Sequence, residues 1–456
     1  MGKKSHKKNK NTSTQASTAK RSISIRLSQC MITKNEERNI ARALSWGKDI
    51  AFEQIVVDTG STDQTVEIAE KMGAKVYHFE WINDFSAAKN YAIEQASGDW
   101  IAFLDADEYF SAGDAKKLLS ILLQIENDPD LKKVNTGITC PLVNLGDNGQ
   151  VFSTTTQQRI FRNVPQIRYK GRVHEALVNL SYPLFTAPDL SIIHTGYSAT
   201  AYTETKKAER NVEIIRAELQ EYPNNPNLLC YLADSLRACG GDDNEKLADN
   251  LYREALTYGS DLQSALRESA YRFLITAHYY AAEEKDEVFE LCKKAYDEFR
   301  DNPDFCYYLG DKLFESGDAA AAWEKMIECE DLLKRPNLMS QSGNIISNPM
   351  LLFYRMVLIA DALDKTTEVI RCATLVLKDS KYEHDLLAPY IAAFNKPGFI
   401  TSTDELFKLL SRLYDFSNTR DKLTVMLAAK AARNTELVQK TLSILTDDEL
   451  EWITKT

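Results

Sequence analysis

Along the first quarter of the chain, short apolar runs alternate with segments whose apolar residues recur at helical spacing. Runs this short, rich in β-branched and aromatic residues, are typical of buried strands, and the longer periodic segments are typical of amphipathic helices. Strand–helix alternation of this kind predicts a mostly parallel sheet with helices on both faces. The expected strands are 23–33, 53–61, 74–81 and 99–107, and the expected helices are 35–47, 62–73 and 85–98.

The pattern changes in the middle of the chain and again near Thr203. Between about residues 138 and 198, further apolar or alternating runs predict strands, whereas almost everything after Thr203 shows helical periodicity. The stretch 225–241 recurs as 302–318, with the same Asn-Pro start and the same Tyr-Leu-x-Asp-x-Leu core. The two copies are separated by about twice the length of a helix-pair repeat. Stacked helix pairs commonly present a concave surface to a peptide or a partner protein.

These patterns predict four segments: a basic tail (1–22), an α/β domain (23–205), a domain of helical repeats similar to tetratricopeptide repeats (206–335), and a C-terminal helical region with degenerate repeats (336–456). The tail has only basic charges in a chain whose net charge is −11, so the remainder is strongly acidic. We expect the tail to be disordered and solubilising, with attraction to anionic lipid as the alternative. The acidic remainder gives no reason to expect nucleic-acid binding.

Other bulk features predict a reduced cytoplasmic protein. No run approaches about 20 consecutive apolar residues, so no membrane span is expected. The N-terminus lacks the apolar core of a secretory signal. The eight cysteines are scattered and include no CxxC pair. Together these features favour free thiols in a reducing compartment.

Carboxylates gather where the expected strands end. The apolar run 100–104 leads directly into Asp105, Asp107 and Glu108, and Asp58 closes the run before it. Acids this close together repel one another unless positive charge lies among them. Two interpretations stay open: a solvated acidic turn, or a divalent cation held by oxygen ligands at the carboxyl edge of the sheet, where such folds bind ligands.

Several motifs, in order, resemble those of the family 2 glycosyltransferases, which are inverting enzymes with a GT-A nucleotide-sugar fold. They are MITKNEERNIARAL, IVVDTGSTDQTVEIA, NDFSAAKN and WIAFLDADEYF. The later motifs RIFRN, VHEAL and IIHTGY resemble one branch of that family. This branch includes bacteriocin peptide S-glycosyltransferases of the sublancin type, which also have helical repeats, and it shares its core with enzymes that glucosylate lipooligosaccharide. The resemblance spans about residues 25–205.

The resemblance implies a metal-dependent UDP-sugar site. In the family pattern Asp105, Ala106 and Asp107 form the motif that contacts the donor and holds Mn²⁺ or Mg²⁺. His194 matches the position of a further metal ligand, although a lone histidine is often only a packed residue. A cation at this place would offset the charge that grows on the departing nucleoside diphosphate.

The resemblance also assigns the nucleoside contacts. Asp58 matches the acid that accepts a hydrogen bond from the uracil ring, and Thr33, Asn35 and Glu36 match a strand end that holds the nucleoside. Asn35 and Glu36 could instead serve as helix caps. Two neighbouring residues are expected to be structural, as a turn and a capping acid: Ser61 and Asp63.

Inversion requires a general base on the face opposite the leaving group. The resemblance makes Glu175 the candidate base and His174 the alternative. A structural interpretation has His174 orienting its loop and Glu175 pairing with Arg172. The resemblance also places Lys89 among the residues that bind the donor. It stands where the family commonly has arginine, so it keeps the charge and loses the bidentate fork. Arg159 could neutralise a phosphate or pair with acids.

The function that these residues imply is transfer of a hexose from a UDP-sugar to a peptide or protein acceptor recruited by the helical repeats. The first alternative is the same chemistry on a cell-surface glycan or lipooligosaccharide. The second is a repeat scaffold whose transferase domain is inactive. The helical region could also support a homodimer.

Overall fold

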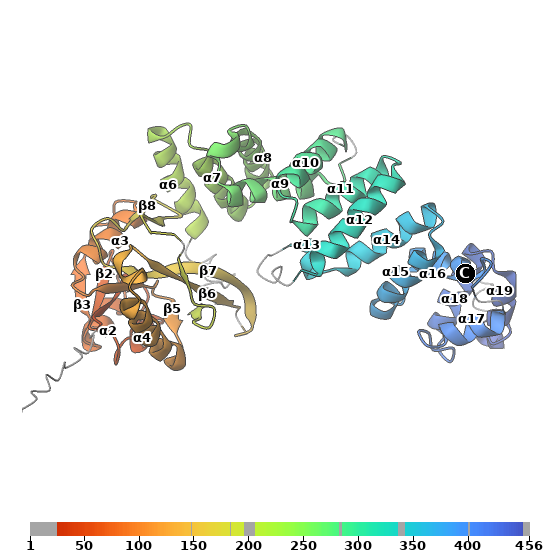
Figure 1. Ribbon diagram of the computed structural model, residues 1–456, viewed down its shortest axis with the longest axis horizontal. Coiled ribbons are helices and arrows are strands. Elements are labelled where there is room, and N and C mark those ends of the chain that lie inside the picture. The colour runs from red at the N-terminus through yellow and green to blue at the C-terminus, as the bar shows by residue number, and fades with distance from the viewer. Residues whose placement is uncertain are drawn as a thin grey trace, which may run out of the picture. The chain divides into compact units, whose positions relative to one another are not determined.

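The computed structural model describes residues 25–146, 148–182, 184–195, 206–281, 285–335, 343–399 and 402–449, and it divides the chain into two compact units, residues 1–223 and 224–456. The first unit is built on a β-sheet and the second is helical (Figure 1). This confirms the predicted α/β domain followed by an all-α region. Helix α6 (Lys207–Glu221), which the sequence placed in the helical region, belongs to the first unit. The basic tail lies outside the described residues.

Four parallel strands form the first half of the sheet, in the order β3-β2-β1-β4. As predicted, helices alternate with them, and side chains on the two faces of β1 enter different apolar clusters. Met31 packs with Ile40, whereas Cys30 packs with Ile93. The elements are β1 (Leu27–Thr33), α1 (Ile40–Ser45), β2 (Glu53–Asp58), α2 (Thr65–Lys71), β3 (Lys75–His78), α3 (Phe85–Glu94) and β4 (Trp100–Phe103).

The second half of the sheet is mixed rather than parallel. Strand β7 runs antiparallel to β4 and pairs with β6, after which come β11 and β5. A separate two-stranded sheet, β8-β9, follows β7 in the chain. The elements are β5 (Glu108–Phe110), α4 (Ala112–Asn127), η1 (Leu131–Lys133), β6 (Gly137–Leu145), β7 (Val151–Arg162), β8 (Arg168–Lys170), β9 (Ala176–Val178), β10 (Phe185–Thr186) and β11 (Ile192–His194).

Several predicted elements are longer than the observed ones: the strand 53–61 ends at Asp58 and the helix 85–98 ends at Glu94. Two further errors concern the strand 99–107 and the helix 35–47. The expected strand 99–107 stops at Phe103, and a turn follows in which the Glu108 amide donates to the Asp105 carbonyl at 2.9 Å. The expected helix 35–47 is reduced to α1, because Asn35 takes a left-handed conformation (φ 57°) that a helix does not admit. Both errors fall at the carboxyl edge of the sheet, where the polar residues gather.

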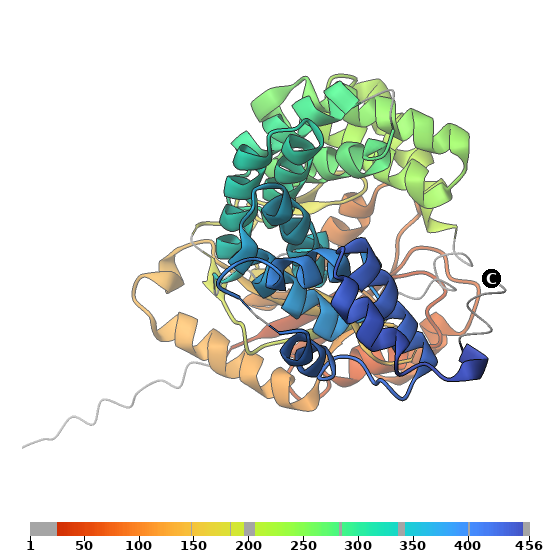
Figure 2. The same cartoon turned by 90° about the vertical axis from the view of Figure 1, so that its right-hand side faces the viewer.

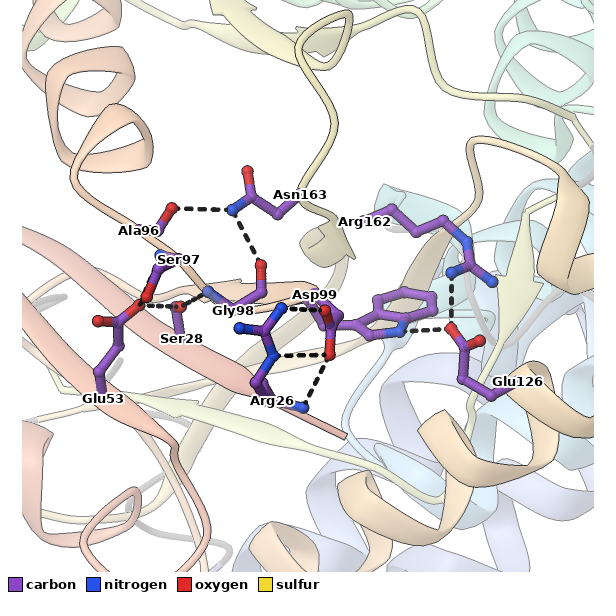
Figure 3. A network of polar contacts seen from close by, with 11 residues as sticks. Arg26, Ser28, Glu53, Ala96, Ser97, Gly98, Asp99, Glu126, Arg162 and Asn163 are labelled. Atoms are coloured by element: carbon purple, nitrogen blue, oxygen red, sulfur yellow. Dashed lines mark hydrogen bonds and ion pairs between the residues drawn. The ribbon is translucent and has the colours of Figure 1, made fainter. Parts of the chain in front are cut away.

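A buried polar network joins the amino-terminal ends of β1, β2 and β4 (Figure 3). Glu53 accepts hydrogen bonds from Ser28 Oγ at 2.7 Å, from Ser97 N at 2.6 Å and from Lys75 Nζ at 2.8 Å. Gly98 leaves room for Ser28, since a Cβ at this position would lie 2.5 Å from its Oγ. Burial alone would raise the pKa of Glu53, but the hydrogen bonds outweigh it and lower the pKa to about 2. This network fixes the strand register at the edge opposite the acids.

The second unit consists of successive helices that pack against their chain neighbours (Figures 1 and 2). As the repeat predicts, α7 and α11 begin alike: the side chains of Asn225 and Asn302 accept from backbone amides, with proline at the first helical position. The helices are α7 (Pro226–Cys239), α8 (Asp242–Leu256), η2 (Gly259–Asp261), α9 (Ser264–His278), α10 (Lys285–Glu298), α11 (Pro303–Glu315), α12 (Ala319–Leu333), α13 (Asn344–Ser347), α14 (Met350–Ala362), α15 (Thr366–Asp379), α16 (His384–Phe394), α17 (Thr403–Leu410), α18 (Thr419–Ala431) and α19 (Thr435–Leu442).

The aspartate kept in both copies of the repeat has the same kind of partner each time. Asp234 accepts a hydrogen bond from the Tyr252 hydroxyl, and Asp311 accepts one from the Tyr279 hydroxyl. Each contact ties the first helix of a pair to a neighbouring segment. This shared aspartate thus takes part in packing in both copies.

Neither membrane spans nor disulfides occur in the parts of the chain described. Within those ranges no helix is long and apolar enough to cross a bilayer. All eight cysteines lie in the described residues, none is in a disulfide, and all but Cys239 are buried. The thiols therefore act as small apolar groups in the cores of both units.

Candidate active site

The acids that follow β4 are neutralised by the protein's own cations. Asp105 Oδ1 lies 3.0 Å from Lys89 Nζ, and Asp105 Oδ2 lies 2.7 Å from Arg159 Nη2. Of the two roles left open for Arg159, pairing with acids is therefore the one observed. Burial alone would raise the pKa of Asp105, but the charges of Arg159 and Lys89 outweigh it and hold the pKa below its usual range.

Arg159 extends from β7 to a second acid. Its Nη2 lies 2.7 Å from Glu108 Oε1, and the other oxygen of Glu108 accepts from the Asp105 amide at 3.0 Å. The Glu108 side chain is only 2% exposed. Burial raises the pKa of Glu108, although the charge of Arg159 opposes the rise. Among the described residues, Arg159 is the cation that pairs with this buried acid.

Lys89 on α3 joins the sheet edge to the candidate base. Its Nζ lies 2.7 Å from Glu175 Oε1 as well as 3.0 Å from Asp105, and its side chain is 3% exposed. The rings of Phe103 and Tyr169 flank the ammonium at 5.3 and 5.1 Å. The structural interpretation that paired Glu175 with Arg172 is wrong, since Arg172 instead contacts α6.

The segment that leads to Glu175 is bound to α3. Asn90 and Tyr169 exchange two side-chain-to-backbone hydrogen bonds of 2.9 Å. Ser86 Oγ donates to the Gly171 carbonyl at 2.6 Å, and His174, which follows, is exposed with φ at 55°. The position of Glu175 is therefore set by α3 together with a bend that most side chains avoid.

Asp107 and His194 form a second polar pair. His194 Nε2 lies 3.2 Å from Asp107 Oδ2, and His194 Nδ1 lies 2.8 Å from Asn144 Oδ1. An amide oxygen only accepts, so Nδ1 carries a proton and Nε2 faces the carboxylate. Burial lowers the pKa of His194, but the hydrogen bond and charge of Asp107 outweigh it and raise the pKa overall.

The fit of a divalent cation can be judged from these donors. In the described residues, no three His, Cys, Asp or Glu side chains are placed to hold a metal by themselves. Of the three predicted ligands, Asp107 and His194 lie together, whereas both oxygens of Asp105 face cations. A histidine that binds a metal through one ring nitrogen usually donates a hydrogen bond from its other ring nitrogen to an oxygen. The pair therefore suits a cation that takes its remaining ligands from substrate phosphates.

The predicted nucleoside residues lie at the ends of β1 and β2 and in the loop that follows β1, which is bonded to the loop after β2. Asp58 accepts from the amides of Gly60 and Ser61 at 3.1 Å. Asn35 donates from its backbone to Ser61 Oγ at 2.9 Å and accepts from the Thr62 amide at 2.8 Å. Thr33 is buried, and its hydroxyl has no partner in the described residues. Asp58, Asn35 and Thr33 thus meet at one edge of the sheet.

The remaining predicted residues lie at the same edge. The Glu36 amide donates to Thr65 Oγ1 at 2.7 Å. Burial raises the pKa of Glu36, a hydrogen bond from Asn39 opposes the rise, and the charge of Asp107 adds to it. Ala106 is buried in the turn. Asp63 makes the kind of contact expected of a capping acid, since its carboxylate accepts a hydrogen bond from the Thr65 amide at 3.0 Å.

Two residues of this cluster were not singled out by sequence reasoning. Asn144 orients His194 from β6, and Tyr169 places its ring beside Lys89. The Tyr169 hydroxyl is buried without a partner in the described ranges, and burial raises its pKa to about 12. Neither residue has a local sequence signal, because both reach the cluster through long-range packing.

Comparison with known proteins agrees with the motifs. Residues 28–129 match the sequence model of glycosyl transferase family 2. This chain resembles the family 2 glycosyltransferases. It is 32% identical over 242 residues to a TPR repeat-containing protein of Synechococcus elongatus, covering 51% of this chain and 57% of that protein. It is 29% identical over 234 residues to the glycosyltransferase SunS of Bacillus subtilis, covering 50% and 53%. The chain thus spans about half the length of these curated relatives.

Solved structures give only distant likenesses. The S. aureus TarS fragment 1–349 in complex with UDP-GlcNAc has a TM-score of 0.36 and 16% identity, covering 64% of this chain and 92% of that one. A glucosyl-3-phosphoglycerate synthase from Mycobacterium tuberculosis in complex with Mn²⁺ and UDP has a TM-score of 0.22 and 21% identity, covering 27% and 45%. Scores this low add nothing to what the sequence match and the side-chain geometry provide.

Proposed function

We propose that this protein is an inverting glycosyltransferase that moves a hexose from a UDP-sugar to a peptide or protein acceptor. The observation that carries the proposal is the edge of the sheet at Asp105–Glu108. There, residues of a segment matching glycosyl transferase family 2 meet Lys89, Arg159, His194 and Glu175. The likeness to a protein named as a glycosyltransferase and to one named for TPR repeats supports the same conclusion.

The donor half of the proposed site comprises Asp58, Asp107 and His194. Asp58 lies at the end of β2, where it would accept the uracil ring N–H while shaping its own turn. Asp107 and His194 would hold Mn²⁺ or Mg²⁺, which when bound offsets the charge that develops on the diphosphate leaving group. Asp105, held by Lys89 and Arg159, would accept from the donor beside them.

The acceptor half of the proposed site is Glu175. As the acceptor nucleophile attacks the anomeric carbon from the face opposite the diphosphate, its proton passes to the Glu175 carboxylate and the bond to UDP breaks. The Lys89 ammonium, 2.7 Å from Glu175 Oε1, would hold the carboxylate in place for this transfer. The helical unit would recruit the acceptor and raise its local concentration.

Hydrolysis of UDP-sugars tests the proposal without knowledge of the acceptor. We expect the full chain to release UDP from one of UDP-glucose, UDP-galactose or UDP-N-acetylglucosamine with Mn²⁺ present, and to stop when a chelator is added. Asp107→Ala should lose nearly all turnover, whereas the exposed Asp331→Ala, in α12, should match the wild type. Full turnover in chelator or in Asp107→Ala would refute the metal assignment, and no turnover or UDP binding by the wild type would refute the function.

A further inference from the structure

We propose that Lys89 is a positioning residue, which sets the place of the Glu175 carboxylate relative to Asp105 and does not itself contact the donor. The inference rests on the function proposed above. The family motif around this position suggests a donor contact instead. The two assignments differ in what Lys89 touches during the reaction, so they can be separated.

The Lys89 ammonium is already engaged. An ammonium has three N–H groups, and oxygens of Asp105 and Glu175 lie 3.0 and 2.7 Å from Lys89 Nζ. The rings of Phe103 and Tyr169 occupy its sides at 5.3 and 5.1 Å, and the side chain is 3% exposed. A phosphate would have to displace one of these two carboxylates to reach it.

The scaffold around Lys89 also fixes Glu175. Helix α3 carries Lys89 and is joined to the strand and loop before Glu175 through Ser86 and Asn90. Further along, the Phe85 amide donates to the Arg172 carbonyl at 2.9 Å. These backbone contacts bring Glu175 close to the sheet edge, and the ion pair with Lys89 then selects one orientation of its carboxylate.

Asp105 does not depend on Lys89 alone. Its second oxygen is held by Arg159 at 2.7 Å, so Asp105 keeps a cation when Lys89 is removed. Glu175 has no second ion-pair partner among the described residues. Loss of Lys89 should therefore disturb the acceptor side of the site far more than the donor side.

A double-mutant cycle tests this role in the full chain. The variants are Lys89→Met, Lys89→Arg, Glu175→Gln and the double variant Lys89→Met/Glu175→Gln. Each is assayed with Mn²⁺ and the UDP-sugar that the wild type hydrolyses, and its UDP affinity is measured by calorimetry. Displacement of a catalytic group by about 1 Å costs on the order of 100-fold in rate.

We expect Lys89→Met to lower kcat about 100-fold while changing the Kd for UDP less than about threefold, and to have little further effect once Glu175 is glutamine. Lys89→Arg should recover part of kcat, because it keeps the charge with a different geometry. Thermal unfolding shows whether each variant folds. If Lys89→Met does not fold, kcat and the Kd for UDP are compared between Lys89→Arg and the wild type.

A large loss of UDP affinity in Lys89→Met, or a kcat effect that persists in the Glu175→Gln background, would refute the positioning role and favour a donor contact. If the wild type neither binds UDP nor hydrolyses a UDP-sugar, the proposed function fails. If the wild type hydrolyses a UDP-sugar but the effects of Lys89→Met and Glu175→Gln on kcat are additive, only the role of Lys89 is overturned.

Discussion

Arg159 provides a stringent test of how the acids at the sheet edge are held. Its Nη2 lies 2.7 Å from both Asp105 Oδ2 and Glu108 Oε1. Arg159→Met keeps much of the apolar stem and removes both contacts, which leaves Glu108 buried without its cation. Breaking a buried ion pair from one side costs about 3–5 kcal/mol. We expect the first unit to lose about that much of its free energy of unfolding.

Native-state hydrogen exchange on the full chain measures this loss as reduced protection of the amides of β4 and β7, which are observed separately from those of the helical unit. A second substitution should compensate, because Arg159→Met/Glu108→Gln no longer buries an unpaired charge. We expect it to recover at least half of the loss. The matched control is Lys71→Met, which breaks an exposed pair with Glu67 and should leave the free energy of unfolding almost unchanged.

The same variant should respond to pH. The pKa of Glu108 is raised above its ordinary value by burial, so Glu108 favours the folded state at low pH, and this contribution is lost as pH rises through the folded pKa. Without Arg159 the pKa rises further, and the deficit of Arg159→Met should shrink between pH 7 and pH 5. A double variant no more stable than the single one, with a deficit independent of pH, would refute this account of the cluster.

Three further outcomes are expected. Asp58→Ala should weaken UDP binding by roughly 10- to 100-fold in calorimetry, since it leaves a ring N–H without an acceptor; an unchanged affinity would remove Asp58 from the site. Glu53, whose pKa is depressed to about 2, stabilises the fold above about pH 4.5 and loses that contribution as pH falls toward 2. The melting temperature of Glu53→Gln should therefore fall less steeply with decreasing pH than that of the wild type, and an equally steep fall would contradict this. Tyr169→Phe should be neutral or stabilising by up to about 1 kcal/mol, because its hydroxyl has no partner in the described residues, and a clear loss would show that the hydroxyl is bonded.

The parallel half of the sheet could be predicted because its signals are local. Each strand is a short apolar run, each helix has its own periodicity, and side chains such as Met31 and Cys30 enter clusters on opposite faces. The Asn-Pro starts of α7 and α11 were equally visible, since capping depends on neighbouring residues. The boundaries at Phe103 and Asn35 were missed because turn geometry decides them there.

The site could be predicted only as a gathering of polar residues. Parallel strands end at one edge, so the convergence of Asp58 and Asp105 follows from topology. The ion pairs do not follow, because they depend on contacts distant in sequence. Arg159 reaches Asp105 since β7 runs antiparallel to β4, and Lys89 reaches Glu175 since α3 binds the segment before it. No local pattern encodes either arrangement.

The most direct test of the proposed reaction is the anomeric form of the released sugar. Proton NMR can follow the hydrolysis of an α-linked UDP-hexose by the full chain with Mn²⁺, faster than the free sugar equilibrates between its anomers. Attack from the face opposite the diphosphate predicts that the β-anomer accumulates first, and that Glu175→Gln slows its appearance. Initial release of the α-anomer, or an undiminished rate in Glu175→Gln, would contradict the inverting mechanism and the place of Glu175 in it.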